Sequence, residues 1–300
     1  YERDENLKNK YINFLYTLAN DYNGLKVVVD CANGSASATA PTLFEKLNVN
    51  AKIIFDSPDG VNINDNCGST HLDALISKVK EVQADLGIAY DGDADRCLLV
   101  TNDGDVIDGD YVLAICGKYL KEKGRLNNNA IVGTVMSNLG LRKFCESENI
   151  NFVATKVGDR YVLEEMLNKD YVIGGEQSGH VIFKEYANTG DGELTSLMVL
   201  NILSERKCKL SELASIMDKC PQVLVNVNVT KEGKTSFGED AEINVLIKKY
   251  EEELNGDGRI LIRASGTENL IRVMIEGKNT EEISRMANDI ADLINKKFGI

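Results

Sequence analysis

The segment that most constrains the fold is an acidic hexapeptide between two short apolar runs. Residues 86–90 (LGIAY) are apolar, residues 91–96 read DGDADR, and residues 97–100 (CLLV) are apolar again. Apolar runs of this length that are bounded by turn residues are typical of buried strands. The pattern therefore predicts a strand, a tight acidic loop and a second strand.

The loop carries three carboxylates, Asp91, Asp93 and Asp95, at alternate positions. Like charges this close repel one another, and a hard divalent cation with oxygen ligands relieves that repulsion, which favours Mg²⁺. Arg96 adds a planar group that binds anions. A metal ion beside an arginine can stabilise a phosphoryl group during transfer. We therefore predict a Mg²⁺ site at the three aspartates, with Arg96 as a catalytic residue beside it.

The acidic loop has three other interpretations. A solvated acidic turn is the simplest alternative in a chain with this many carboxylates. A calcium-binding EF-hand is excluded, because Arg96 and Asn102 occupy the loop positions that require glycine and glutamate. An aspartyl-phosphate enzyme, with Asp91 or Asp93 as the nucleophile at the end of a strand, remains a chemical rival.

The composition limits the partners of the chain. Lys plus Arg number 34 and Asp plus Glu number 47, a net charge of −13, which argues against a nucleic-acid partner. No apolar stretch reaches transmembrane length, so no membrane partner is expected. The seven cysteines are scattered and odd in number, which favours free thiols and a cytoplasmic location.

Strands and helices alternate along the first two thirds of the chain, and this rhythm predicts α/β architecture. After Pro221 the order changes to a strand, a helix, two paired strands and a terminal helix. We predict two consecutive α/β domains, residues 1–124 and 125–221, and a smaller α+β domain, residues 222–300. Ligands of α/β sheets bind at the carboxyl ends of the strands, where the acidic loop is placed.

A glycine-rich segment, residues 174–180 (GGEQSGH), follows a predicted strand. Glu176 can accept hydrogen bonds from paired hydroxyls, and Ser178 and His180 can bind hydroxyl or phosphate oxygens, so we predict a sugar-binding loop. His180 could also donate a proton. A glycine-rich turn with incidental polar groups is the alternative.

Two further segments offer cations to an anionic ligand. Between two strands near the C-terminus, hydroxyls and arginines form a predicted phosphate cradle, namely Arg263, Ser265, Gly266, Thr267 and Arg272. At a predicted strand–helix junction, Lys156, Asp159 and Arg160 lie where a substrate could bind a helix N-terminus. A plain loop and a solvated turn are the respective alternatives.

Residues 68–71 (GSTH) place a serine close to a histidine, as a hydrolase would. No companion acid stands at the spacing of a hydrolytic triad, so we interpret Ser69 or Thr70 as the N-cap of the next helix. Residues 189–192 (TGDG) are likewise predicted to cap the helix that follows them.

Taken in order, these motifs resemble those of the α-D-phosphohexomutase superfamily. The shared segments are residues 91–96, 175–180 (GEQSGH) and 263–268 (RASGTE). Residues 156–161 (KVGDRY), 62–64 (NIN) and 67–71 (CGSTH) look most like the bacterial phosphoglucosamine mutase branch. The motifs together cover the chain almost from end to end.

The resemblance implies an isomerase that interconverts glucosamine 6-phosphate and glucosamine 1-phosphate on the route to UDP-N-acetylglucosamine and the cell wall. A phosphoserine would donate its phosphoryl group, and a hexosamine 1,6-bisphosphate would act as intermediate and primer. The family roles would place Mg²⁺ on the three aspartates and His180 near the reacting oxygen. Sugar hydroxyls would contact Glu176 and Ser178. The C-terminal cradle would grip the non-reacting phosphate.

The sequence also departs from the family pattern. Members have four domains, and this sequence starts at the linker into the second, so we expect the phosphoserine domain to be missing and the chain alone to be inactive as a mutase. Ala94 stands where glycine is common, and Ala264 and Asn269 replace common prolines. Two other functions stay open: a sugar-phosphate-binding module without chemistry, and an aspartyl-phosphate phosphatase that uses Asp91. A homodimer is a possible assembly, because a missing domain would expose a surface that favours association.

Overall fold

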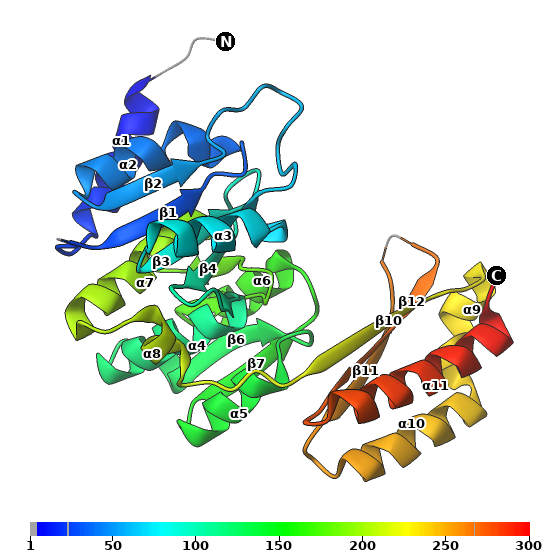
Figure 1. Cartoon of the computed structure of the whole chain (residues 1–300). Helices are drawn as coiled ribbons and strands as arrows, with labels where there is room; N and C mark the ends of the chain where they lie inside the picture. The colour runs from blue at the N-terminus through cyan, green and yellow to red at the C-terminus, as the bar shows by residue number, and fades with distance from the viewer. Residues whose placement is uncertain (1–4, 23, 267) are drawn as a thin grey trace. The chain divides into compact units, whose positions relative to one another are not determined.

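The computed structural model describes residues 5–22, 24–266 and 268–300, which form two compact units (Figure 1). The first unit comprises the residues up to 137 together with residues 141–218. The second comprises residues 138–140 together with residues 219–300.

The first unit contains two mixed sheets. The five-stranded sheet has the order β2 (Asn50–Ile54), β1 (Lys26–Asp30), β3 (Leu86–Tyr90), β4 (Cys97–Thr101) and β5 (Val106–Ile107). The four-stranded sheet has the order β7 (Asn151–Thr155), β6 (Ala130–Thr134), β8 (Ile173–Gly175) and β9 (Val181–Phe183). In the five-stranded sheet β1 pairs in parallel with β2 and β3, whereas β3–β4 and β4–β5 are antiparallel. In the four-stranded sheet β6 pairs in parallel with β7 and β8, whereas β8–β9 is antiparallel.

Helices accompany both sheets. The helices of the first half are α1 (Glu5–Thr17), α2 (Ala40–Lys46) and α3 (Asp73–Val82). Those of the second half are α4 (Gly109–Glu122), α5 (Leu139–Ser147), α6 (Asp159–Lys169), α7 (Gly192–Arg206) and α8 (Leu210–Ala214). The alternation of strands and helices that the sequence predicted is therefore present in both halves.

The central strand β3 is buried along its whole length, and its side chains alternate between two apolar layers. Ile88 and Tyr90 join a core that also contains Ile131 of β6 and Leu197 of α7. Ala89 points to the other layer, which includes Leu75 and Val79 of α3. Because a single core includes side chains from both sheets, the two α/β halves pack as one unit.

The second unit is an antiparallel sheet with helices. Its strand order is β10 (Gln222–Asn228), β12 (Leu270–Glu276) and β11 (Arg259–Ala264). Its helices are α9 (Lys231–Ser236), α10 (Ala241–Leu254) and α11 (Thr280–Phe298), and α11 lies along β10 and β12 (Figure 1). Apolar residues of α11 recur at helical spacing, as Ile283, Met286, Ile290 and Ile294 show, and all four are buried against the sheet.

The fold class predicted from the sequence is confirmed: two α/β halves precede a smaller α+β unit. One local prediction is wrong. Ser69 and Thr70 do not cap α3; they lie in a 3₁₀ turn, and the N-cap of α3 is Leu72, which provides no side-chain bond. The predicted cap of α7 is confirmed, because Asp191 Oδ1 accepts a hydrogen bond from the Leu194 N–H at 2.9 Å.

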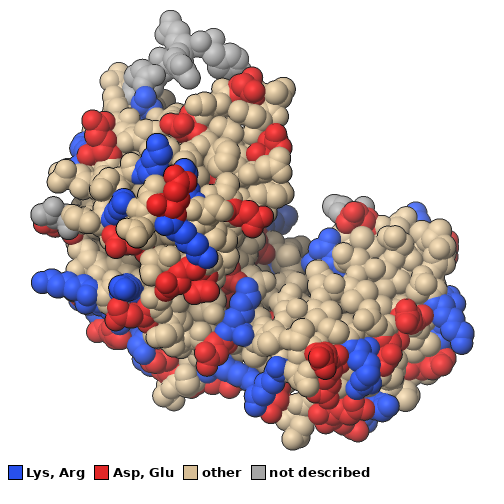
Figure 2. Space-filling view, in the orientation of Figure 1, with Lys and Arg blue, Asp and Glu red and all other residues tan. Residues whose placement is uncertain are grey.

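Two surface properties bear on partners. Among the helices of the described residues, none combines the length and apolar character needed to cross a bilayer. On the face drawn in Figure 2, acidic and basic side chains of the first unit are interspersed and do not form a broad basic surface. This pattern agrees with the net negative charge of the sequence.

Candidate metal and sugar-phosphate site

The acidic loop begins where β3 ends. Carboxylate oxygens of Asp91, Asp93 and Asp95 lie within 4.8 Å of one another, so the structure brings the three predicted metal ligands together. A turn in which the Ala94 N–H donates to the Asp91 carbonyl at 3.0 Å places alternate side chains on one side of the loop. Ala94 has a left-handed φ of +60°, a conformation that glycine adopts more readily.

The electrostatics of the loop favour a cation. The pKa of Asp91 is raised to about 6. Burial is the main cause, the Arg96 N–H opposes it, the charges of Asp95 and Asp93 add to it, and the Arg96 guanidinium lowers the pKa. Arg96 Nε lies 3.7 Å from Asp91 Oδ2 and 3.8 Å from Asp95 Oδ1. This guanidinium is partly exposed, so solvent weakens its effect.

One carboxylate oxygen of the loop has no hydrogen-bond partner. Asp95 Oδ1 is buried and accepts no hydrogen bond, although Arg96 Nε lies 3.8 Å from it. A buried oxygen in this state is costly unless something compensates its charge. Three carboxylates with mutual repulsion and one orphaned oxygen are a donor set that fits Mg²⁺.

Backbone contact with the segment that follows β1 holds the acidic loop in place. The Ser35 N–H donates to the Gly92 carbonyl at 2.8 Å. A Cβ atom on Gly34 would overlap with that same carbonyl oxygen, so the two backbones can approach this closely only because residue 34 is glycine.

The predicted sugar loop joins β8 to β9 and is bonded to the chain next to the acidic loop. Within it, the Glu176 N–H donates to the His180 carbonyl at 2.9 Å and the Gly179 N–H to the Glu176 carbonyl at 3.0 Å. The Cys97 N–H donates to the Gly179 carbonyl at 3.1 Å. Since Cys97 directly follows Arg96, the structure places these two loops side by side.

The strand–helix junction that contains Lys156, Asp159 and Arg160 contacts the predicted sugar loop. The Gly158 N–H donates to Glu176 Oε1 at 2.9 Å and so fixes that carboxylate. The three predicted ligand residues of the junction are exposed, as is Ser178 of the sugar loop.

His180 is only 3% exposed, and protein groups contact both of its ring nitrogens. Nδ1 lies 3.0 Å from Asp95 Oδ2, and the Gly190 N–H donates to Nε2 at 2.9 Å. The predicted donation of a proton would need a ring nitrogen that faces the ligand. In this arrangement each nitrogen is already engaged by the protein.

Sequence reasoning did not identify an acidic pair at the start of α7, the half-buried Asp191 and the buried Glu193. Glu193 is 2% exposed and accepts one hydrogen bond, from the Thr39 hydroxyl, while its Oε2 has no partner. Burial raises the pKa of Glu193 to about 8; the Thr39 bond lowers it and the charge of Asp191 raises it. Tyr11 donates to Asp191 Oδ1 at 2.8 Å. Because an acidic residue in the first turn of a helix is usually exposed, nothing in the sequence pattern indicates this burial.

The predicted phosphate cradle belongs to the second unit. Arg263 of β11 lies directly opposite Arg272 of β12, and the Nε atoms of both are buried without a hydrogen-bond partner. Burial, and then the charge of Arg272, lowers the pKa of Arg263. Two adjacent guanidinium groups with unused donors are well suited to a phosphate dianion.

The loop between these strands is closed by backbone bonds. The Ser265 N–H donates to the Leu270 carbonyl at 2.9 Å, and Ser265 Oγ accepts from the Glu268 N–H at 3.3 Å. Gly266 is exposed, and the predicted ligand Thr267 lies outside the described residues. Glu268 Oε2 lies 3.5 Å from Arg272 Nη2, so it is the carboxylate a phosphate would displace.

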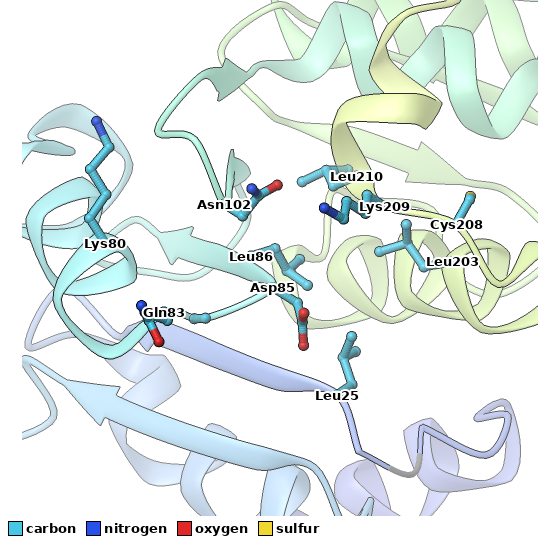
Figure 3. Close-up of a pocket in the computed structure, with 11 residues that line it drawn as sticks. Leu25, Lys80, Gln83, Asp85, Leu86, Asn102, Leu203, Cys208, Lys209 and Leu210 are labelled. Atoms are coloured by element: carbon cyan, nitrogen blue, oxygen red, sulfur yellow. The ribbon is translucent and has the colours of Figure 1, made fainter.

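A cavity of about 420 Å³ lies elsewhere in the first unit (Figure 3). Its lining includes Leu25, Leu86, Leu203 and Leu210, and Figure 3 shows Lys80 pointing away from these leucines. Leu86 begins β3, whereas the acidic loop follows the end of that strand, so the cavity lies at the opposite edge of the sheet from the predicted chemistry.

Three family models match consecutive parts of the chain. They describe phosphoglucomutase/phosphomannomutase: alpha/beta/alpha domain II at residues 8–104, alpha/beta/alpha domain III at residues 108–220, and the C-terminal domain at residues 224–293. The chain belongs to this phosphohexomutase family. The family resemblance inferred from the motifs is thereby confirmed.

Two curated relatives of this phosphohexomutase chain have the same name. The phosphoglucosamine mutase of Clostridium acetobutylicum is 52% identical over 98% of the chain and 66% of its own length. That of Clostridium novyi is 53% identical over 94% of the chain and 63% of its own length. The chain therefore spans slightly less than two thirds of the relatives it matches.

Solved structures agree in fold. A phosphoglucomutase/phosphomannomutase family protein of Burkholderia thailandensis superposes with a TM-score of 0.81 at 22% identity, over 98% of this chain and 66% of that one. N-acetylphosphoglucosamine mutase of Aspergillus fumigatus, in complex with GlcNAc-6P and magnesium, gives 0.75 at 20% identity, over 96% and 69%.

Proposed function

We propose that this chain forms the metal-binding, sugar-binding and phosphate-binding parts of a phosphoglucosamine mutase. The reaction is the interconversion of glucosamine 6-phosphate and glucosamine 1-phosphate. The observation that carries the proposal is the bonding of the three-aspartate loop to the glycine-rich sugar loop through Cys97 and Gly179. Relatives that are 50–53% identical carry this name, which supports the choice of glucosamine.

The side chains of the first unit would divide the work at the reacting end of the sugar. Asp91, Asp93 and Asp95 would hold Mg²⁺, which supplies positive charge to the phosphoryl group when it is bound. Arg96 adds a second positive charge beside the same loop. Glu176 has its Oε1 fixed by the Gly158 N–H, which leaves its other oxygen for a sugar hydroxyl.

The second unit would hold the phosphate that does not react. Arg263 and Arg272 provide unused donors, and Ser265 lies in the loop between their strands. Contacts with the phosphate that does not react hold the sugar in place. Their binding energy can therefore be used to orient the reacting end of the sugar.

The phosphoryl donor is a separate question. The family uses a phosphoserine in a loop similar to Thr-Ala-Ser-His-Asn-Pro, and the printed sequence contains no such loop. We therefore propose that this chain binds hexosamine phosphates but does not turn them over without a serine-bearing domain.

Mutase activity on glucosamine 6-phosphate tests the proposal, with Mg²⁺ and glucosamine 1,6-bisphosphate as primer. The purified chain is assayed alone and after addition of the separately expressed N-terminal domain of a relative. Activity only after addition supports the proposal, whereas activity of the chain alone contradicts its second part.

Calorimetry with glucosamine 6-phosphate distinguishes the non-catalytic alternative. Saturable binding that Arg263→Ala weakens, without turnover in either mixture, would favour a sugar-phosphate-binding module. Release of phosphate from a general substrate such as p-nitrophenyl phosphate, abolished by Asp91→Asn, would instead favour the aspartyl-phosphate phosphatase.

A further inference from the structure

The ring nitrogens of His180 have different partners, and one of these partners sets the tautomer. The Gly190 N–H can only donate, so Nε2, at 2.9 Å from it, must accept and carries no proton. A neutral imidazole then has its proton on Nδ1. Nδ1 therefore donates to Asp95 Oδ2 at 3.0 Å.

The segment that contains Gly190 is itself fixed against the acidic loop. The Gly192 N–H donates to the Ala94 carbonyl at 2.8 Å. A Cβ atom on Gly190 would lie 2.6 Å from the Asp95 carbonyl oxygen and equally close to the imidazole ring, so the backbone, the ring and the loop are in direct contact. Since the ring is also buried, it has no room to turn over.

The hydrogen bond from Nδ1 determines which oxygen of Asp95 remains available to bind a metal ion. Oδ2 is satisfied by His180, whereas Oδ1 is buried and has no hydrogen-bond partner. A ligand carboxylate that is held by a neighbouring hydrogen bond binds metal more tightly than one that must be ordered first.

We infer that His180 is a positioning residue: as the Nδ1–H tautomer, it orients Asp95 so that Oδ1 faces the metal site. The inference rests on the proposed metal site at the three aspartates. This role replaces that of proton donor, which the sequence predicted. The Nδ1–H of His180 already donates a hydrogen bond to Asp95, and Nε2 accepts one from the Gly190 N–H.

Nitrogen NMR of the imidazole rings tests the tautomer directly. The chain has two histidines, His71 and His180, so two-bond ¹H–¹⁵N spectra of histidine-labelled protein contain two ring systems. The variant His71→Asn assigns them. We expect His180 to be protonated on Nδ1 alone, with and without glucosamine 6-phosphate. A proton on Nε2 in either state would overturn the inference.

Two variants with opposite geometry test the consequence for metal binding. The amide nitrogen of asparagine lies near the place of Nδ1, whereas the end of a glutamine side chain lies near the place of Nε2. We expect His180→Asn to bind Mn²⁺ within about threefold of the wild type, and His180→Gln to bind it about ten- to a hundredfold more weakly. His71→Asn, at an exposed site, serves as the matched control.

Mn²⁺ affinity is measured by electron paramagnetic resonance of the free ion, with circular dichroism to show that each variant is folded. Equal affinity of the Asn and Gln variants would overturn the positioning role while the metal site stands. Failure of the wild type and the His71→Asn control to bind Mn²⁺ would refute the metal site and, with it, this inference. The NMR result would still report the tautomer independently.

Discussion

Replacement of Glu193 by glutamine should stabilise the first unit at neutral pH and remove a large part of its pH dependence. Glu193 is 2% exposed, and only the Thr39 hydroxyl bonds to it. Its pKa rises from 4.5 to about 8 on folding, mainly because burial disfavours the charged form. At neutral pH the folded chain must therefore hold a proton that the unfolded chain releases.

The sign and size of the effect follow from this shift. Below the unfolded pKa of 4.5 both states are protonated, so Glu193 has no effect on the free energy of unfolding through ionisation. Between pH 4.5 and pH 8 the free energy of unfolding falls by about 1.4 kcal/mol per pH unit. The total loss is about 3 kcal/mol at pH 7 and about 5 kcal/mol above pH 8. Because the carboxyl is buried, solvent screening does not reduce these values.

Glutamine cannot ionise, and its amide oxygen can still accept the Thr39 hydroxyl. Its additional N–H has no partner at the position of Oε2, which costs about 1 kcal/mol at every pH. We therefore expect Glu193→Gln to be more stable than the wild type by about 2 kcal/mol at pH 7, a margin that grows up to pH 8 and then stays constant.

Urea unfolding followed by far-ultraviolet circular dichroism, at several pH values between 5.5 and 9, measures this difference. Glu164→Gln is the matched control, because it is the same substitution at an exposed position. The reasoning is refuted if the difference between Glu193→Gln and the wild type does not vary with pH, or if Glu164→Gln gives the same slope.

Three more outcomes are expected. Asp91→Asn should weaken Mn²⁺ binding at least tenfold in calorimetry, and unchanged affinity would remove Asp91 from the metal site. Gly34→Ala should lower the melting temperature because the new Cβ overlaps with the Gly92 carbonyl, whereas Gly238→Ala, with open space around it, should leave the temperature unchanged. Arg263→Ala should weaken binding of inorganic phosphate by about 1.5–3 kcal/mol in calorimetry, and equal binding would exclude Arg263 from the cradle.

Much of the site could be predicted because its residues follow strands. The acidic loop was recognisable from apolar runs on both sides of alternating carboxylates, and the structure confirms that it follows the end of β3. The bond between Cys97 and Gly179 could not be predicted, since it depends on how two sheets share one core. Sequence spacing says which residues end a strand, but not which loops meet.

The failures have physical causes at particular residues. Ser69 follows the pattern of a helix cap, yet the buried carboxylate of Asp30 accepts the Gly68 N–H at 2.9 Å and draws this segment into a 3₁₀ turn. Glu193 follows the pattern of an exposed acid in a first helical turn. Its burial results from packing against the first half of the unit, where Thr39 lies.

The supports of the acidic loop have a consequence for how this chain can be divided. All three aspartates fall within residues 8–104, the part matched by the domain II model, whereas His180, Gly190 and Gly192, which hold Asp95 and Ala94, fall within residues 108–220. A piece cut between these matches would keep every proposed metal ligand and lose the groups that hold the last of them. The segment that supplies the proposed ligands and the segment that orients Asp95 are therefore encoded separately, and we expect a change in either one to alter the same proposed ion site.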